Sequence, residues 1–231
     1  MIPGGLEARV RALGRAVPSG LAVFDADGTL WREDVGEAFL RHLVSLGWVR
    51  LPDGSDPYEE YERRVDRDRA AGYAYAAQLQ AGLEVAKVAA EAERFARGWV
   101  PPRLVADALG LRALCEGAGL RTVVVSASAL PIVLAAAPLA GFSREFCRGI
   151  EVAVRDGRFT DQVIRPITYA GGKIEAAERW GEIALACGDS FTSDLPLLQR
   201  AREAVVVAPE QGSSLAEEAL RRGWAVLAQD R

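Results

Sequence analysis

The chain of 231 residues has little of several residue types on which common scaffolds depend: no asparagine, one methionine, one histidine and three cysteines. The cysteines, Cys115, Cys147 and Cys187, form an odd, scattered set, which is typical of a reducing compartment and excludes a disulfide framework. The single histidine, His42, lies in an apolar helical pattern. We therefore interpret it as a structural residue rather than a catalytic one.

Long apolar runs and basic stripes are also missing. No apolar stretch reaches the length that spans a bilayer, and residues 1–20, in which arginines alternate with apolar residues, lack the continuous apolar centre of a signal peptide. That segment predicts a short amphipathic helix instead. The net charge of −4 argues against a nucleic-acid partner. We therefore expect a cytoplasmic protein that binds neither nucleic acid nor a membrane.

The most informative stretch begins with four apolar residues, 21–24, and continues with Asp25, Asp27 and Gly28. A short continuous apolar run predicts a strand of a parallel sheet that is covered on both faces. Because side chains alternate along a strand, Asp25 and Asp27 are expected to point the same way at its carboxyl end. Ligands of open α/β sheets bind at that end, and Gly28 allows the sharp turn that follows.

Beyond residue 100, predicted strands alternate with predicted helices, which indicates an α/β fold with a doubly wound parallel sheet. A hairpin is expected across residues 150–163, around Asp156 and Gly157. Further strands are predicted at 122–125, 183–187, 204–207 and 224–227, and helices at 104–118, 131–139, 174–180, 193–201 and 213–222.

Residues 32–100 differ from this alternation, because they show helical spacing and no strand pattern. An acidic segment before residue 38 predicts the start of a helix, and two adjacent prolines close the section at 101 and 102. We therefore predict a core built from residues 1–31 and 101–231, with a helical cap of residues 32–100 inserted after the first strand.

One segment matches the sequence pattern of a known class of phosphatase. Cys115 and Arg121-Thr122 have the Cys-x5-Arg-Thr spacing of cysteine-based phosphatases. In those enzymes the cysteine follows a strand and its loop leads into a helix. Here a helix is predicted before Cys115 and a strand after Arg121, so the order is reversed. We interpret Cys115 as a small buried residue and not as a nucleophile.

Four polar sites lie at strand ends or helix starts of the predicted sheet. They are Asp25-Ala-Asp27-Gly28-Thr29, Ser126, Lys173 and Gly188-Asp189-Ser-Phe-Thr-Ser-Asp194. Lys173 is one of only two lysines in a chain with 26 arginines, which is expected where a compact point charge is needed. This set, in this order, resembles the four motifs of the haloacid dehalogenase superfamily. The helical insertion resembles its phosphoserine-phosphatase-like branch, which has a helical cap of the C1 type.

The resemblance implies a Mg²⁺-dependent phosphatase that hydrolyses a small phosphate monoester through an aspartyl phosphate. Asp25 would be the nucleophile, and Asp27 would protonate the leaving alcohol and later activate water. Asp25, Asp189 and the main-chain carbonyl of Asp27 would hold Mg²⁺, and Asp194 would orient that shell. The residues expected to bind the phosphoryl oxygens are Ser126, Lys173, Gly28 and Thr29.

Alternative activities share parts of this pattern. Asp27 favours a phosphatase over a dehalogenase, because a halide leaves without a proton. Phosphomutases or other phosphotransferases of the same superfamily also carry both aspartates and helical caps. A catalytically silent binding module or a regulatory domain would have lost a motif residue, and Asp25, Asp27, Lys173 and Asp189 are all present.

The expected partner is a small phosphorylated metabolite, chosen by the cap as it closes over the site. Glu33 stands where phosphoserine phosphatases place a glutamate that binds the substrate amine, and Arg63 or Arg64 could pair with a carboxylate. The favoured interpretation of these two arginines is nevertheless that they are charges on a solvated helix face.

Two further features bear on the substrate. The Ser126-Ala-Ser sequence departs from the Ser-Gly-Gly of phosphoserine phosphatases. Aromatic residues in and next to the insertion could form a cage for a phosphocholine-like substrate, although helix packing is the favoured interpretation. They are Trp31, Trp48, Tyr58, Tyr61, Tyr73 and Tyr75. Phosphoserine-like and phosphocholine-like esters are therefore both open at this point.

Overall fold

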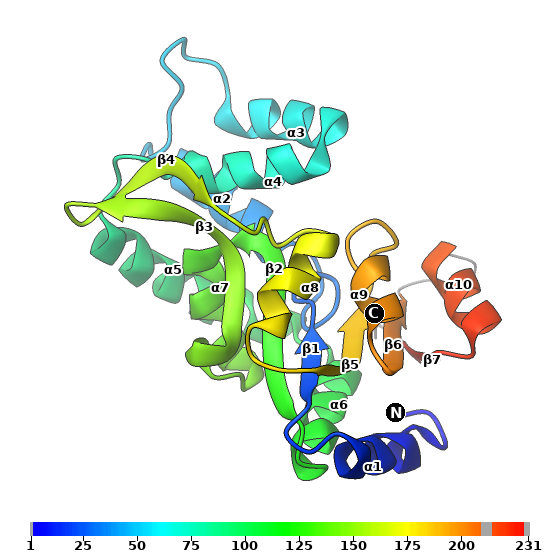
Figure 1. The fold of residues 1–231 in the computed structure, drawn as a ribbon. Coiled ribbons are helices and arrows are strands. Elements are labelled where there is room, and N and C mark those ends of the chain that lie inside the picture. The colour runs from blue at the N-terminus through cyan, green and yellow to red at the C-terminus, as the bar shows by residue number, and fades with distance from the viewer. Residues whose placement is uncertain (1, 209–213, 229–231) are drawn as a thin grey trace.

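The computed structural model describes residues 2–208 and 214–228. In this part of the chain one seven-stranded sheet has the order β4-β3-β2-β1-β5-β6-β7, and every pair is parallel except β3–β4 (Figure 1). The strands are β1 (Leu21–Phe24), β2 (Arg121–Ala129), β3 (Cys147–Arg155), β4 (Arg158–Ile164), β5 (Ile183–Gly188), β6 (Glu203–Ala208) and β7 (Ala225–Ala228). The chain order is reversed on the two sides of β1, so the residues that follow β1 lie at the switch point where α/β proteins bind ligands.

The helices alternate with these strands, and the predicted α/β fold with a doubly wound sheet is confirmed. They are α1 (Leu6–Ala16), α2 (Val35–Ser45), α3 (Pro57–Arg67), α4 (Arg69–Gln78), α5 (Val85–Trp99), α6 (Ala106–Gly117), α7 (Leu130–Ala136), α8 (Gly171–Glu178), α9 (Leu195–Arg200) and α10 (Ser214–Arg222). The predicted amphipathic helix near the N-terminus is α1.

Some boundaries differ from the predicted ones, for local reasons. The second strand continues to Ala129, beyond the predicted end at 125, and pairs again with β3 there. Helix α9 begins at Leu195 rather than at 193, because Asp194 occupies its N-cap position and binds the loop before it. Of the predicted helix 213–222, Ser213 lies outside the described residues, as do residues 1, 209–213 and 229–231 of the predicted core.

The central strands β1 and β5 are buried on both faces, which explains why they are continuously apolar in sequence. The strand β4 at one edge and β7 at the other contain both buried and exposed residues. Along β1, Leu21 and Val23 pack with α8, α9 and α10 on one face. Ala22 and Phe24 pack on the other face with α1, α6, α7 and the helices of the insertion. This alternation directs successive side chains to opposite faces, as the period of a strand requires.

Residues 32–100 contain α2 to α5 and no strand, as predicted. Each of the first three helices begins with an aspartate whose side chain accepts a backbone N–H: Asp34 for α2, Asp56 for α3 and Asp68 for α4. Helices α2 and α5 pack against α7, whereas α3 pairs with α4, which itself packs against β2, β3 and β4 (Figure 1). All four helices share one apolar cluster with the sheet. The insertion is therefore anchored through α2, α4 and α5, and α3 lies outermost.

The side chain of His42 links two helices of the insertion. Its Nε2 lies 2.5 Å from Glu91 Oε1 on α5, and its ring packs in one cluster with the rings of Phe39 and Phe95. These contacts support a structural role. All three cysteines are unpaired and buried, and burial raises the pKa of the Cys115 thiol to about 12. Cys115 lies within α6, ahead of a strand, so it does not have the setting of a thiolate nucleophile.

Helices of the described residues are all too short or too polar to cross a bilayer.

The packing of α6 gives a direct test of the fold. Leu111 is completely buried beneath the sheet, whereas Leu220 on α10 is 83% exposed. We expect Leu111→Ala to lower the free energy of unfolding by about 2–5 kcal/mol, because it removes buried methyl groups and leaves a cavity. The matched change Leu220→Ala is expected to alter it by about 0.5 kcal/mol or less. Urea denaturation followed by circular dichroism measures both; equal losses would contradict the packing described here.

Candidate active site

The site is organised around Lys173, which lies in the first turn of α8 and is 1% exposed. Its Nζ donates to Asp25 Oδ1 at 2.5 Å and to Asp194 Oδ1 at 2.6 Å. Asp25 follows β1 and Asp194 precedes α9, so one ammonium group joins three elements that are distant in sequence. The pKa of Lys173 is raised; burial opposes this, but the two adjacent carboxylates outweigh it.

Asp189 completes the carboxylate group at the end of β5. Its Oδ1 accepts a hydrogen bond from Thr29 Oγ1 at 3.0 Å. Asp194 Oδ2 accepts from the backbone N–H of Asp189 and of Ser190, which fixes the loop. Gly28 has φ +77, and a Cβ there would collide with the Asp189 carboxylate. The glycine is therefore needed for both its backbone conformation and the close approach.

These three aspartates form a group suited to a hard divalent cation. One carboxylate oxygen from each of Asp25, Asp189 and Asp194 lies within 4.8 Å of the others, and oxygen ligands are those that Mg²⁺ prefers. Two buried carboxylates, Asp25 and Asp194, and the half-buried Asp189 share one ammonium group, which leaves a surplus of negative charge. Burial, and next the charge of Asp194, raises the pKa of Asp25 to about 7. Burial, and next Asp25, raises the pKa of Asp189 well above its usual range. The residues therefore fit Mg²⁺, which would neutralise this surplus.

Asp27 lies outside that group, and its carboxylate is held by four donors. Oδ1 accepts from Trp31 Nε1 at 2.7 Å and from the Val35 N–H at 2.8 Å. Oδ2 accepts from Ser128 Oγ at 2.7 Å and from Ser126 Oγ at 3.2 Å. Trp31 is fully buried and does not line the pocket. Its role is therefore to hold the Asp27 carboxylate in position.

The predicted phosphate-binding residues divide into two groups. Lys173 lines the pocket, whereas Ser126, Gly28 and Thr29 do not. Ser126 is fully buried and accepts the N–H of Ser128, and the Gly28 N–H donates to the Trp31 carbonyl. Ser128, two residues beyond Ser126 on β2, lines the pocket instead. The period of a strand puts both serines on the same side and could have indicated this second serine.

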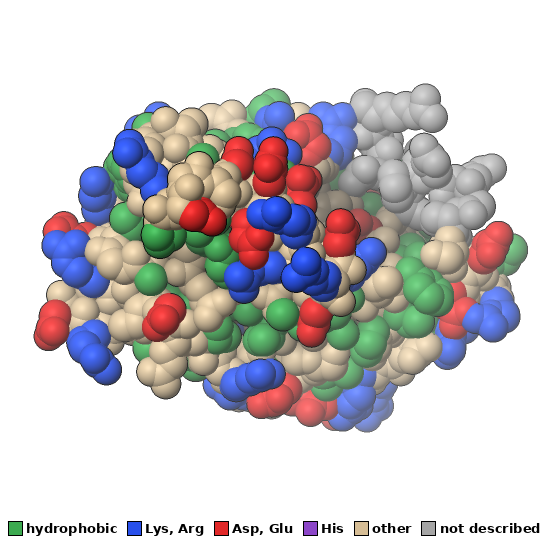
Figure 2. All heavy atoms as spheres, turned by 90° about the horizontal axis from the view of Figure 1, so that it is seen from above, with side chains coloured by type: hydrophobic (Ala, Val, Ile, Leu, Met, Phe, Trp, Pro, Cys, Tyr) green, Lys and Arg blue, Asp and Glu red, His purple; other side chains and the backbone are tan. Residues whose placement is uncertain are grey.

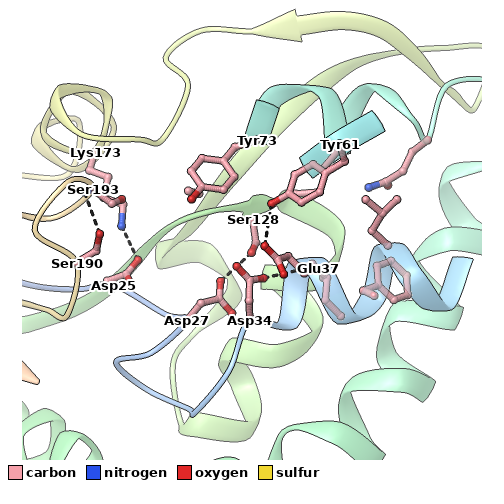
Figure 3. A pocket seen from close by; sticks show the side chains of 18 of the residues that line it. Asp25, Asp27, Asp34, Glu37, Tyr61, Tyr73, Ser128, Lys173, Ser190 and Ser193 are labelled. Carbon is pink, nitrogen blue, oxygen red and sulfur yellow. Dashed lines mark hydrogen bonds and ion pairs between the residues drawn. The ribbon is translucent and has the colours of Figure 1, made fainter. Parts of the chain in front are cut away.

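A cavity of about 170 Å³ lies between the ends of the strands and the insertion. In the view of Figure 3, Lys173, Asp25, Ser190 and Ser193 occupy one end. The other end is lined by Asp34 and Glu37 of α2 and by Tyr61 of α3 (Figure 3). Asp27, Ser128 and Tyr73 of α4 lie between the two ends. The sheet thus supplies the floor, and the insertion supplies the opposite wall.

The structure does not bring Glu33 to this cavity. Glu33 has φ +67, which turns its side chain outward, where it is 63% exposed and accepts from Arg103 Nε at 3.0 Å. The chain then enters α2, so Asp34 and Glu37 face the pocket in its place. Sequence reasoning missed both, although an N-cap aspartate followed by a glutamate three residues later is a recognisable helix start.

The two candidate arginines of α3 are also outside the pocket. Arg63 and Arg64 both pair with Glu60 on their own helix, at 2.8 and 2.7 Å. Their side chains are largely exposed, and Figure 2 shows charges of both signs interspersed on the upper face of the molecule, the side on which α3 lies. They are solvated surface charges.

The candidate aromatic residues separate in the same way. Tyr61 and Tyr73 line the pocket, and the other four do not; these are Trp31, Trp48, Tyr58 and Tyr75. Trp48 and Tyr75 have a lysine or arginine over their rings, Lys87 and Arg64 respectively. Most of the aromatic residues of the insertion therefore serve packing.

Comparison with known proteins gives a family and a fold. The family model of haloacid dehalogenase-like hydrolases matches residues 22–199. Among curated proteins, no match is found.

Several solved structures share the architecture. A protein of unknown function from Bordetella pertussis Tohama I is 23% identical, with a TM-score of 0.78 over 91% of this chain and 98% of that one. A phosphoserine phosphohydrolase-like protein from Francisella tularensis subsp. tularensis SCHU S4 is 16% identical, with a TM-score of 0.58 over 90% and 94%. A probable phosphoserine phosphatase from Vibrio cholerae is 15% identical, with a TM-score of 0.63 over 97% and 68%. At these identities the likeness shows the fold.

The carboxylate surplus predicts how pH and Mg²⁺ act on stability. Because the pKa of Asp25 is about 7 in the folded chain, against an ordinary 3.8, the folded chain holds more protons than the unfolded one between these values. In EDTA the free energy of unfolding should therefore fall as the pH rises from about 4 to 7. Mg²⁺ competes with protons, so it should stabilise the protein more at pH 7.5 than at pH 5. At about 100 times its Kd at pH 7.5, the ion should add about 2.7 kcal/mol relative to the metal-free protein.

Thermal denaturation with and without Mg²⁺ at both pH values measures this effect. Asp189→Asn should abolish most of the stabilisation, whereas Asp66→Asn, an exposed carboxylate on α3, should retain it. Equal stabilisation of the wild type and Asp189→Asn would rule out the metal site.

Proposed function

The chain belongs to the haloacid dehalogenase-like hydrolase family, and from this membership we propose that it is a phosphatase that hydrolyses a small phosphate monoester. One observation carries the proposal: Asp25, buried at the end of the central strand, is bound to Lys173 and lines one cavity together with Asp27. This arrangement provides a nucleophile, a cation and a second carboxylate around the place where a phosphoryl group would sit.

In the first step, a carboxylate oxygen of Asp25 attacks phosphorus, and the bond between phosphorus and the ester oxygen breaks. Asp27, in its protonated form, gives its proton to the leaving alcohol. Lys173 lies 2.5 Å from Asp25 Oδ1, where its charge also offsets that of the phosphoryl oxygens. The product is an aspartyl phosphate at Asp25 and a free alcohol.

In the second step, Asp27 takes a proton from water as the water oxygen attacks phosphorus. The acyl phosphate bond breaks, inorganic phosphate leaves and the Asp25 carboxylate is restored. The four hydrogen bonds to Asp27 fix its carboxylate toward the cavity for both steps. Positioning of this kind is the main contribution that a protein makes to phosphoryl transfer.

Asp25, Asp189 and the main-chain carbonyl of Asp27 would hold Mg²⁺, with Asp194 orienting the group. When bound, the ion would neutralise charge on the phosphoryl oxygens. The convergence of the three carboxylates supports this assignment. Lys173 then acts beside the ion and keeps Asp25 and Asp194 in place.

Residues 32–100 would act as a cap over a core of residues 1–31 and 101–231. Support comes from the position of Tyr61 and Tyr73, which α3 and α4 hold over the cavity. A cap of this kind excludes water from the reacting groups. The cavity volume of about 170 Å³ is below the roughly 300–1,000 Å³ of pockets that enclose drug-sized ligands. The substrate would therefore be a small ester.

The proposed nucleophile is tested with p-nitrophenyl phosphate. We expect hydrolysis with Mg²⁺, little in EDTA, and a loss of at least about a thousandfold in kcat for Asp25→Asn, because no carboxylate is left to attack. The control variant Asp66→Asn, an exposed carboxylate of α3, should keep the wild-type rate. A fully active Asp25→Asn enzyme would contradict the proposal, and phosphate exchange between esters without net release would indicate a phosphotransferase instead.

The role of Asp27 as an acid gives a second test. For alkyl phosphates, Asp27→Asn should slow the first step by about a hundredfold to ten-thousandfold in single-turnover experiments. For p-nitrophenyl phosphate the loss should be much smaller, because p-nitrophenolate leaves readily without a proton. Equal losses for both esters would show that Asp27 does not protonate the leaving group.

A further inference from the structure

The cavity contains a second acidic region that phosphoryl transfer does not use. Asp34 and Glu37, at the N-cap and in the first turn of α2, line the end opposite Lys173. Among the ion pairs of the described residues, none involves either carboxylate; Arg63 and Arg64 of the facing helix are taken up by Glu60. Arg41 of α2 lies over the ring of Tyr58, 3.5 Å from its centroid. The charge of Arg41 acts on Glu37 from outside the pocket lining. Burial, and next the charge of Asp27, raises the pKa of Asp34 well above its usual range, so Glu37 is the main carboxylate that a ligand cation would meet here.

Glu37 is held in a defined orientation. Tyr58 OH donates to Oε2 at 2.9 Å, and Tyr61 OH donates to Oε1 at 3.3 Å. Both carboxylate oxygens are thus held by hydroxyl donors from α3. Glu37 therefore presents its carboxylate to the cavity in a fixed orientation and does not need to reorganise when a ligand binds.

Aromatic side chains lie beside this carboxylate. Tyr61 and Tyr73 line the cavity with ring centroids 6.5 Å apart, and Phe39 lines it from α2. The faces of aromatic rings attract cations, and the attraction is larger when the cation is removed from water. Carboxylates flanked by aromatic rings are therefore chemically suited to an ammonium group.

Two buried polar atoms without partners lie in the pocket-lining residues. Gln80 is 3% exposed and its Oε1 has no hydrogen-bond donor; Ser193 Oγ, from the phosphoryl end, is also unpaired. Buried polar atoms are nearly always satisfied, so both point to a ligand. Gln80 Oε1 calls for an N–H donor, and Ser193 Oγ can donate to a phosphoryl oxygen.

The charge of the pocket also excludes one kind of substrate. Among the described residues that line it, Lys173 is the sole cation, and it lies at the phosphoryl end. A carboxylate on the substrate would face Asp34 and Glu37 with no positive partner. A phosphorylated amino acid is therefore opposed by like charges.

We propose that the substrate is the phosphate monoester of a small amino alcohol, with a primary ammonium group and no carboxylate, and that Asp34, Glu37 and the rings of Tyr61 and Tyr73 bind this ammonium group. The inference rests on the proposed phosphatase function and names its substrate class. The phosphoryl group lies against Lys173 and Ser193, and the ammonium group donates hydrogen bonds to Glu37 and Gln80.

Phosphoethanolamine and propyl phosphate form a matched pair for the test, because they differ only in an ammonium group in place of a methyl group. We expect kcat/KM with Mg²⁺ to favour phosphoethanolamine by at least about tenfold, and phosphoserine to be a poorer substrate than phosphoethanolamine. Glu37→Gln should bring the ratio of the matched pair toward one. Glu59→Gln, an exposed carboxylate of α3, should leave the ratio at its wild-type value.

A binding measurement separates this inference from the proposed function. Calorimetric titration of Asp25→Asn, which cannot form the aspartyl phosphate, should give a lower Kd for phosphoethanolamine than for propyl phosphate. If the wild type hydrolyses both esters equally, the substrate assignment is wrong and the phosphatase function stands. If no ester is hydrolysed but the ammonium ester binds more tightly, the phosphatase function is wrong and the ammonium site stands. Equal binding of both esters would overturn the ammonium site.

Discussion

The contact on which the rest of the structure depends is the buried ammonium of Lys173 between the carboxylates of Asp25 and Asp194. A charge removed from water is stable only with partners, and each partner here comes from a different element of the sheet or its helices. The ion pair therefore fixes α8, the end of β1 and the start of α9 relative to one another. Because one ammonium group cannot neutralise three carboxylates, an excess of negative charge remains that suits a divalent cation. The same contact therefore stabilises the fold and prepares the metal site.

The two ends of the cavity follow the same electrostatic rule. At one end, three aspartates exceed their single ammonium partner. At the other, no ion pair of the described residues involves Asp34 or Glu37, and the charge of Arg41 acts on Glu37 only from outside the pocket lining. A pocket built in this way is completed by positive charge from outside: a metal ion at the phosphoryl end and, in our proposal, an ammonium group at the substrate end. Specificity then arises from the insertion and reactivity from the sheet, although both contribute to a single cavity.

The fold could be predicted from the sequence because its signals are local. Buried parallel strands are continuously apolar, and Asp25, Lys173 and Asp189 lie at strand ends or helix starts that short patterns reveal. The substrate end could not be predicted in this way. Whether Glu33 or Asp34 faces the cavity depends on the positive φ of Glu33 and on the capping of α2. Likewise, the sequence does not reveal that Trp31, from outside the pocket lining, donates a hydrogen bond to Asp27 Oδ1.

The central claim, that Asp25 carries the phosphoryl group during turnover, is tested most directly by trapping that state. The protein would be mixed with Mg²⁺ and a phosphate ester, quenched in acid within the first turnover and digested for mass spectrometry. We expect one added phosphoryl group on the peptide that contains Asp25, and none when EDTA removes Mg²⁺ before the ester is added. Turnover without a covalent phosphoryl group, or a label on another residue, would contradict it.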